Sequence, residues 1–227
     1  MNNIAIIPAR SGSKGLKDKN IKELNGIPLI GYSIKAAKEA GVFSHVMVST
    51  DSDRYAEIAR DLGAEVPFLR SAQASSDNAG SWDVVREVLS GYKEHFDTIC
   101  LLQPTSPLRT AEDIVAGYKE LEEKNADAIT AVCEMDHSPL WSIPLDETLS
   151  LVNLRKQLAD VPRQMLKTYY RINGALYIRR LNYDNGVIKI LDRREYAYIM
   201  DRKRSVDIDI IDDFELAVYI IRGGAKK

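Results

Sequence analysis

The feature that most constrains this chain is a repeating order of apolar run, polar loop and helical stretch. Ile4–Pro8, Val46–Thr50, Ile99–Leu102 and Ala128–Val132 have the length and composition of buried strands. Helical patterns separate them, at Pro28–Ala40, Arg54–Leu62, Ser81–Tyr92 and Ala111–Leu121. Strands that alternate with helices predict βαβ units and therefore an α/β fold around a mostly parallel sheet covered by helices.

The rhythm stops after His137. Residues 138–168 contain three prolines and several basic residues and show no clean period, so we expect this segment to leave the sheet. Strand patterns return at Ala175–Ile178 and Tyr196–Met200, and Asp213–Arg222 has the pattern of a closing helix. The sequence predicts one α/β domain over residues 1–227 with an inserted arm at residues 138–172.

Charge and composition exclude several classes of protein. The 31 Lys and Arg residues against 33 Asp and Glu give a net charge of −2, which argues against a nucleic-acid binder. No apolar run approaches the ~18 residues that span a bilayer, and Met1–Ile7 leads into a strand without the pattern of a secretory signal. Cys100 and Cys133 lie in apolar runs, as reduced core thiols do, so we expect a cytoplasmic protein.

The loop Pro8–Asn20 is the first candidate site, because ligands of open α/β sheets bind beyond the carboxyl ends of strands. Gly12 and Gly15 permit close approach of backbone N–H groups to phosphate oxygens, and Arg10, Lys14 and Lys19 carry charge that would neutralise a triphosphate. The spacing is neither that of a P-loop nor that of a dinucleotide fingerprint. A solvated basic loop remains the alternative.

Two further strand ends carry polar side chains. Gln103 follows Ile99–Leu102, where its amide would hydrogen-bond a base or a sugar, and a surface amide without a ligand is the alternative. Asp51 follows Val46–Thr50, but Asp51 or Ser52 would also cap the next helix, so we interpret this acid as structural.

Paired acids form the last candidate site. If Ser205–Ile210 is a strand, Asp207 and Asp209 point to one side, whereas Val206, Ile208 and Ile210 point into the core. Two adjacent carboxylates repel each other unless a cation lies between them, which favours a hard divalent cation with phosphate oxygens. The alternative is an edge strand with a charged solvent face.

Taken together, the motifs resemble the acylneuraminate cytidylyltransferase family, the CMP-sialic acid synthetases. The resemblance runs the length of the chain and is carried by seven motifs in order: PARSGSKGLKDKN (8–20), VSTD (48–51), SSDNAGS (75–81), LLQPTSPLRT (101–110), PRQ (162–164), RINGALYI (171–178) and SVDID (205–209). It implies a mixed-sheet, Rossmann-like nucleotidyltransferase fold, a homodimer, and formation of a CMP-sugar and pyrophosphate from CTP and a nine-carbon 2-keto sugar acid with Mg²⁺.

The resemblance also implies roles for individual residues. Arg10, Lys19 and Asp209 would be catalytic, and Asp207 and Asp209 would bind Mg²⁺. The nucleotide-binding residues would be Arg10, Ser13, Lys14, Lys19, Asn20, Arg70 and Ser81. Gln103, Arg163 and Arg171 would contact the sugar, with a contribution across the dimer.

One position departs from the family pattern. Some members carry a lysine near the sugar carboxylate where this chain has Trp141, so sialic, legionaminic and pseudaminic acids all remain candidate substrates. Activity on Kdo or another 2-keto sugar acid is an alternative, and a non-catalytic nucleotide-binding module is another. The apolar content of residues 138–168 predicts that the arm forms the dimer contact.

Overall fold

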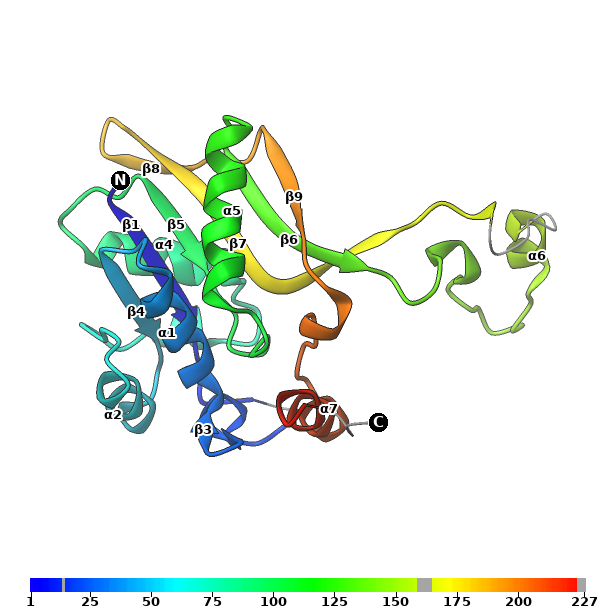
Figure 1. Cartoon of the computed structure of the whole chain (residues 1–227), viewed down its shortest axis with the longest axis horizontal. Helices are drawn as coiled ribbons and strands as arrows, with labels where there is room; N and C mark the ends of the chain where they lie inside the picture. The colour runs from blue at the N-terminus through cyan, green and yellow to red at the C-terminus, as the bar shows by residue number, and fades with distance from the viewer. Residues whose placement is uncertain (14, 159–164, 224–227) are drawn as a thin grey trace.

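A seven-stranded mixed sheet forms the centre of the protein (Figure 1). The computed structural model describes residues 1–13, 15–158 and 165–223, with the side chains of residues 157 and 158 left aside. The strand order is β4-β1-β5-β7-β6-β9, with β8 paired to β7. These strands are β1 (Asn3–Pro8), β4 (His45–Ser49), β5 (Thr98–Leu101), β6 (Ala128–Glu134), β7 (Tyr170–Asp184), β8 (Val187–Ile190) and β9 (Glu195–Ile199).

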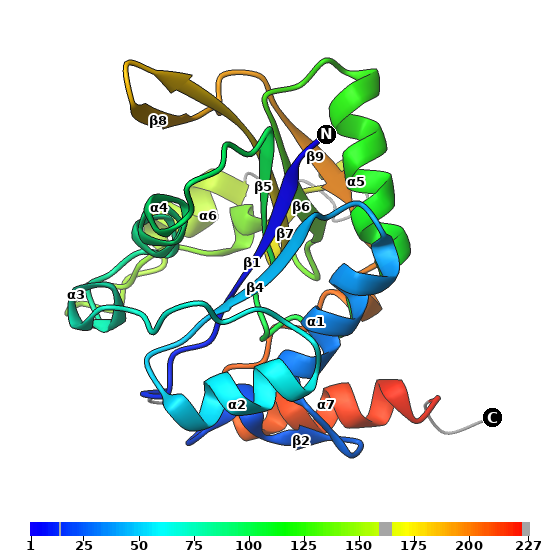
Figure 2. The same ribbon diagram turned by 90° about the vertical axis from the view of Figure 1, so that its left-hand side faces the viewer.

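Helices cover both faces of the sheet, as Figure 2 shows. One face packs against α1 (Leu29–Ala40), α2 (Asp53–Asp61) and α5 (Ala111–Glu123), whose buried side chains include Ile34, Ala56 and Leu121. The other face packs against α4 (Ser81–Gly91) through Val84, Val85, Val88 and Leu89. Apolar layers on both faces fix the sheet between helices, which is the arrangement that the alternating sequence pattern predicts.

Smaller elements complete the region below the sheet. A third apolar cluster joins α7 (Ile211–Ile221) to the short hairpin of β2 (Glu23–Leu24) and β3 (Ile27–Pro28), with Leu24, Ile208 and Phe214 in its core. The remaining helical turns are η1 (Lys19–Ile21), α3 (Ala72–Ser75), η2 (Pro139–Trp141), α6 (Val152–Leu158) and η4 (Arg202–Arg204). Both η1 and η4 lie in segments that border the sheet's carboxyl edge.

The direction of β7 decides which residues lie at the carboxyl edge of the sheet, where β1, β4 and β5 end. β1 is parallel to both β4 and β5, and β6 is parallel to β9, whereas β7 is antiparallel to both β5 and β6. The beginning of β7 therefore lies beside the carboxyl ends of its neighbours. Thr130 lies opposite Tyr177 but Val132 lies opposite Ile172, so β7 bulges away from β6 between Ile172 and Tyr177.

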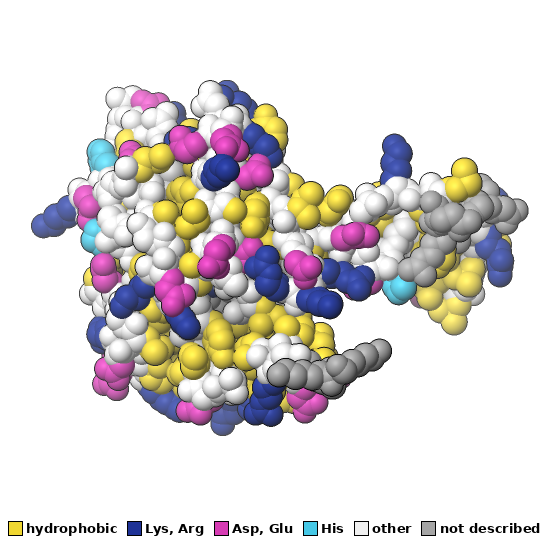
Figure 3. Space-filling model, in the orientation of Figure 1, with side chains coloured by type: hydrophobic (Ala, Val, Ile, Leu, Met, Phe, Trp, Pro, Cys, Tyr) yellow, Lys and Arg dark blue, Asp and Glu magenta, His cyan; other side chains and the backbone are white. Residues whose placement is uncertain are grey.

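The segment between β6 and β7 extends away from the sheet (Figure 1). Glu134 pairs with Tyr170 at the base of this arm, and η2 and α6 lie farther out along it. Figure 3 shows apolar side chains on its outer part. Leu145, Leu149 and Met165 are exposed there.

The α/β class and the mixed sheet are confirmed, and so are the predicted strands and helices apart from one. The predicted strand Ser205–Ile210 is wrong, because this segment pairs with no neighbouring strand. Its polar backbone groups bond elsewhere instead: the Ile208 N–H donates to the carbonyl oxygen of Thr105 at 2.8 Å, and the N–H groups of Asp209 and Ile210 donate to Asp213. Ile210 is 51% exposed and does not enter the core.

Within the described part of the chain, no helix has the length and apolar character needed to cross a membrane.

Candidate functional site

A cavity of about 590 Å³ opens at the carboxyl edge of the sheet. Its walls come from the loops after β1 and β5, from Arg70 and the residues around α3, from the start of α4, and from the segment that precedes α7. Most of the residues singled out by sequence line this cavity: Arg10, Ser13, Lys19, Asn20, Arg70, Ser81, Gln103, Asp207 and Asp209. Lys14 and Arg163 lie outside the described residues.

The loop after β1 is held in a fixed shape by its neighbours. Asp51 accepts hydrogen bonds from the Ser11 backbone N–H at 2.8 Å and from the Ser11 hydroxyl at 3.2 Å. The buried amide of Asn20 donates to the carbonyl oxygen of Arg10 at 3.0 Å. Asp51 therefore has the structural role that we expect, although Ser52 rather than Asp51 caps α2. These bonds direct the Arg10 side chain across the cavity.

Arg10 pairs with a carboxylate on the opposite wall. Its Nη1 lies 2.9 Å from Asp77 Oδ1 and 3.4 Å from the carbonyl oxygen of Ser75. Asp77 belongs to the loop between α3 and α4, so this ion pair connects two segments that are 67 residues apart. The guanidinium is partly exposed and stays accessible to an anionic ligand.

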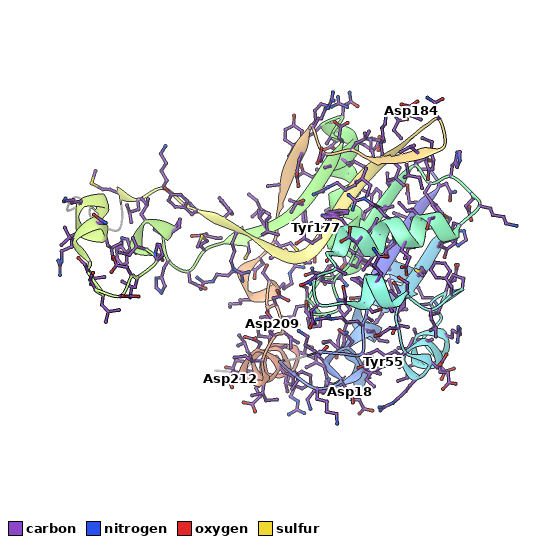
Figure 4. The ribbon with its side chains drawn as sticks, turned by 180° about the vertical axis from the view of Figure 1, so that it is seen from behind. Asp18, Tyr55, Tyr177, Asp184, Asp209 and Asp212 are labelled. Carbon is purple, nitrogen blue, oxygen red and sulfur yellow. The ribbon has the colours of Figure 1, made fainter. Side chains whose placement is uncertain are left out.

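Lys19 crosses the lower end of the cavity in the same way. Its Nζ donates to the carbonyl oxygen of Ile208 at 2.7 Å and to Asp209 Oδ1 at 2.9 Å. The lysine side chain is 13% exposed, whereas the Asp209 side chain is 75% exposed. Gly15 permits this close contact, because a Cβ there would lie 2.6 Å from the carbonyl oxygen of Asp209. Figure 4 shows Asp209 beside the start of α7.

Arg70 forms the wall behind the loop after β4. Its Nε donates to the Ser49 hydroxyl at 3.0 Å, and its Nη2 donates to the Ser49 carbonyl oxygen at 2.5 Å. Burial lowers the pKa of the Arg70 guanidinium, and the carboxylates of Asp51 and Glu87 oppose that effect. Arg70 thus brings a positive charge to the cavity from a rigid position.

Gln103 lies against the bulge of β7. Gly174 has φ +77°, and a Cβ at that position would lie 2.5 Å from Gln103 Oε1. The chain therefore needs glycine at this point both for its conformation and for the close approach of the amide. The next turn of the same loop supplies the Thr105 carbonyl oxygen that accepts from Ile208, so the Gln103 loop also holds the segment that carries Asp207.

Asp207 is the most unusual acid of the cavity. Its Oδ1 is buried and has no hydrogen-bond partner among the described residues. Burial raises the pKa of Asp207, and the charge of Asp209 adds to that effect. The Thr105 hydroxyl and the charges of Lys19 and Arg171 act in the opposite direction. A buried carboxylate oxygen without a donor is a position that a cation would stabilise.

Arg171 does not line the cavity. Its Nη2 donates to the carbonyl oxygen of Ser205 at 3.2 Å, and the side chain is exposed at the beginning of β7. From there its positive charge lowers the pKa of Asp207. Its position is near the base of the arm rather than beside the phosphate-binding loop.

The comparison with protein families decides the assignment. A model described as cytidylyltransferase matches residues 4–215, which is nearly the whole chain. The chain belongs to the cytidylyltransferase family. Its fold is also that of CMP:2-keto-3-deoxy-manno-octonic acid synthetase, solved in complex with CTP, with a TM-score of 0.71, 15% identity, and coverage of 98% of this chain and 99% of that one.

Two relatives of known name show where this chain lies in the family. It is 36% identical over 218 residues to the N-acylneuraminate cytidylyltransferase of Escherichia coli O18:K1:H7, covering 96% of this chain and 51% of that protein. It is 30% identical over 225 residues to the pseudaminic acid cytidylyltransferase of Campylobacter jejuni, covering 98% and 97%. The chain thus spans about half the length of the first relative and nearly all of the second.

The oxygen donors of the cavity fit Mg²⁺. Asp207 and Asp209 supply hard carboxylate oxygens, and Oδ1 of Asp207 meets no hydrogen-bond donor from the residues that the structure describes. The described residues contain no group of three or more His, Cys, Asp or Glu side chains that would enclose a metal ion. Mg²⁺ characteristically binds through one or two carboxylates and completes its shell with water and substrate phosphates, so two carboxylates are enough for such a site.

Several site residues escaped the sequence analysis. Asp77 lies within the motif SSDNAGS, but nothing in the sequence indicates that it pairs with Arg10. Thr105 and Arg109 lie within LLQPTSPLRT without a pattern that separates their roles from those of the prolines. Asn173 was not singled out either, although its buried amide donates to the Ser205 hydroxyl at 2.9 Å. Each of these contacts joins segments that are far apart in the chain, so no pattern of neighbouring residues in the sequence indicates it.

The environment of Asp207 predicts how the metal-free protein responds to pH. Folding raises the pKa of this carboxyl group above its value of 3.8 in the unfolded chain, so the folded state favours the protonated form. The protein is therefore more stable where the group is protonated, and this part of the free energy of unfolding is lost as the pH rises through the folded-state pKa. In EDTA at pH 7, Asp207→Asn is therefore expected to unfold at an equal or higher urea concentration than the wild type. After allowance for solvent screening, the gain is about 1 kcal/mol at most.

The exposed Asp192→Asn is the matched control for this measurement, because it removes one acid without a buried oxygen. The difference between Asp207→Asn and the wild type is expected to shrink towards pH 4. A clear loss of stability for Asp207→Asn at pH 7 would contradict the interpretation.

Proposed function

We propose that this protein is a CMP-nonulosonate synthetase, which transfers the cytidylyl group of CTP to a nine-carbon 2-keto sugar acid. One observation carries the proposal: a single cavity brings Arg10 and Lys19 together with Asp207 and Asp209 in a chain of the cytidylyltransferase family. Cations for a triphosphate and paired carboxylates for its metal are the two requirements of nucleotidyl transfer. The names of the N-acylneuraminate and pseudaminic acid relatives support the class of acceptor.

The proposed reaction is an in-line displacement at the α-phosphorus. The anomeric hydroxyl oxygen of the sugar acid forms a bond to the α-phosphorus, the bond to the β-phosphate oxygen breaks, pyrophosphate leaves, and the hydroxyl proton passes to water. Little covalent work falls to the protein, so its contribution is position and charge. Arg10 and Lys19 would hold the triphosphate by exchanging Asp77 and Asp209 for phosphate oxygens.

The remaining residues divide between the two substrates in this proposal. Ser13, Asn20, Arg70 and Ser81 line the nucleotide side of the cavity, and Gln103 lies on the acceptor side with Arg171 beyond it. Asp207 and Asp209 would hold Mg²⁺, which when bound supplies a Lewis acid for the phosphoryl oxygens and lowers the pKa of the attacking hydroxyl. Lys14 and Arg163 remain sequence-based candidates for the triphosphate and the sugar.

Pyrophosphate release tests the proposed function directly. The assay offers CTP, UTP or ATP together with N-acetylneuraminic, legionaminic, pseudaminic or Kdo acid in the presence of Mg²⁺. We expect turnover with CTP and one of the first three acids. Turnover with Kdo alone would assign the acceptor to the alternative class, equal turnover with UTP would contradict the nucleotide preference, and no turnover at all would favour a nucleotide-binding module without catalysis.

The paired acids predict a metal-dependent loss of activity. Asp209→Asn removes a charged oxygen ligand, and we expect turnover to fall by about two orders of magnitude, or about 2.7 kcal/mol in the barrier. Asp207→Asn is expected to be no more damaging. The measurement is turnover against Mg²⁺ concentration, with melting temperatures of the metal-free variants beside it.

Asp212→Asn is the control for the metal experiment, since Asp212 lies near Asp209 at the start of α7 and is exposed (Figure 4). It is expected to keep both its turnover and its Mg²⁺ dependence. An Asp209→Asn enzyme with unchanged Mg²⁺ dependence and near-normal activity would show that the acids are a solvated surface.

We also propose that the arm forms a homodimer. Leu145, Leu149, Leu151, Val152 and Met165 are all exposed on it, which is more apolar surface than a solvated projection carries without a partner. Light scattering at micromolar concentration is expected to give twice the chain mass of 25.5 kDa. The double variant Leu149→Asp with Met165→Asp is expected to give a monomer, whereas Val187→Asp on the exposed β8 hairpin is expected to remain dimeric. A monomeric wild type would refute this proposal.

A further inference from the structure

Arg109 is a buried cation for which the proposed reaction has no use. It follows the loop after β5, is 2% exposed, and lies where water does not neutralise its charge. Burial lowers the pKa of Arg109 to about 10, so the guanidinium remains charged at neutral pH. Within the described residues no carboxylate lies within ion-pair distance of it. Burying such a charge is costly, so its contacts require an explanation.

The contacts of Arg109 are almost entirely to backbone carbonyl groups. Nη1 donates to the carbonyl oxygens of Ala175 at 3.0 Å and of Gln103 and Ser106 at 3.4 Å each. Nη2 donates to the Ser33 hydroxyl at 2.7 Å. Three oriented carbonyl dipoles thus take the place of a counter-ion. They belong to two segments, the loop after β5 and the bulge of β7, and Ser33 anchors both to α1.

Both segments that Arg109 joins also bond to residues 205–209, the acid-bearing segment that carries Asp207 and Asp209. From the loop, the Thr105 carbonyl oxygen accepts from the Ile208 N–H at 2.8 Å. From the bulge, Asn173 Nδ2 donates to the Ser205 hydroxyl at 2.9 Å. Residues 205–208 belong to no strand, so these bonds, rather than a sheet ladder, fix the direction of Asp207.

The bulge of β7 also contacts Gln103. The Gln103 amide packs against Gly174, and the carbonyl oxygen of the same glutamine accepts from Arg109. A shift of the loop relative to the bulge would therefore move Gln103 and Asp207 together. On the nucleotide side, Arg10 has separate supports in the loop after β1 and in Asp77, whereas Lys19 bonds to Ile208 and Asp209 of the acid-bearing segment.

We propose that Arg109 is a positioning residue that sets Gln103, on the acceptor side of the cavity, and Asp207, at the metal position, by clamping the loop after β5 to the bulge of β7. The word "acceptor" rests on the proposed function, whereas the clamp itself rests on the contacts alone. The role needs a guanidinium, because Nη1 contacts the carbonyl oxygens while Nη2 contacts the Ser33 hydroxyl, and the single nitrogen of an ammonium group does not span both positions. An apolar side chain of similar length would remove the Arg109 donor from the Ala175 carbonyl oxygen and from the Ser33 hydroxyl, whereas the Gln103 and Ser106 carbonyl oxygens would keep the N–H groups of Ser106 and Arg109.

The test compares Arg109→Lys and Arg109→Met with Arg180→Met. Arg180 also bonds a backbone carbonyl, that of Ala126, and an acid, Glu122, but it lies at the far end of β7. Hydrogen exchange at the Ile208 amide reports whether the acid-bearing segment is held. We expect exchange there to be faster by about tenfold or more in both Arg109 variants than in the wild type, and unchanged in Arg180→Met.

Binding and kinetics separate positioning from a general loss of structure. In both Arg109 variants the Kd for CTP without Mg²⁺ is expected to stay within about threefold of the wild type, because the metal position then takes no part in binding. The KM for the sugar acid, measured with Mg²⁺, is expected to rise by about fivefold or more. A further variant, Arg109→Ala, tests whether the missing group itself is responsible. Guanidinium added at millimolar concentration is expected to replace the side chain and to lower the KM of this variant for the sugar acid. If Arg109→Met does not fold, Arg109→Lys carries the test, because it keeps the charge and loses the fork.

Two results would overturn the proposal: unchanged exchange at Ile208 in the folded Arg109 variants, or a loss of CTP binding that equals the loss for the acid. Hydrogen exchange and CTP binding need no turnover. If no sugar acid is a substrate, the proposed function fails and these two measurements still decide the role of Arg109.

Discussion

The candidate site depends on the antiparallel direction of β7. Five strands of the sheet end at one edge, and β7 begins there between β5 and β6, so that Arg171, Asn173 and Gly174 join the loops that follow the parallel strands. The bulge after Ile172 then turns the backbone towards Gln103. Bulges characteristically redirect side chains beside active sites, and this one also supplies a carbonyl oxygen to the buried Arg109.

Charge in the cavity is arranged as pairs across its opening. Arg10 pairs with Asp77 and Lys19 pairs with Asp209, so each cation is already oriented by a carboxylate from the opposite wall. A triphosphate would replace carboxylate oxygens with phosphate oxygens around the same nitrogen atoms. Asp207 is the exception, because its buried Oδ1 has no donor in the described part of the chain, and the raised pKa of this acid reflects the cost of that burial.

Local signals explain why most of the elements were predictable. Gly41 ends α1 with φ 65°, and the Ser52 hydroxyl caps the first turn of α2, so the helix boundaries follow from residues beside them. The buried strands were equally clear from their apolar runs. The segment Ser205–Ile210 shows the limit of this reasoning: its alternation is that of a strand, but a strand also needs a free neighbouring edge, and no local pattern reports whether one exists.

The sequence by itself determined the α/β class, the positions of the buried strands along the chain and the types of residue around the cavity. Those properties depend on hydrophobic periodicity, on capping residues and on the motifs that resemble a family. Only the tertiary structure decided that Arg10 pairs with Asp77, that Lys19 pairs with Asp209, and that Arg109 joins the Gln103 loop to the bulge of β7. The physical reason is that these contacts join segments far apart in the chain, and their geometry is set by how the sheet and helices pack rather than by neighbours in sequence.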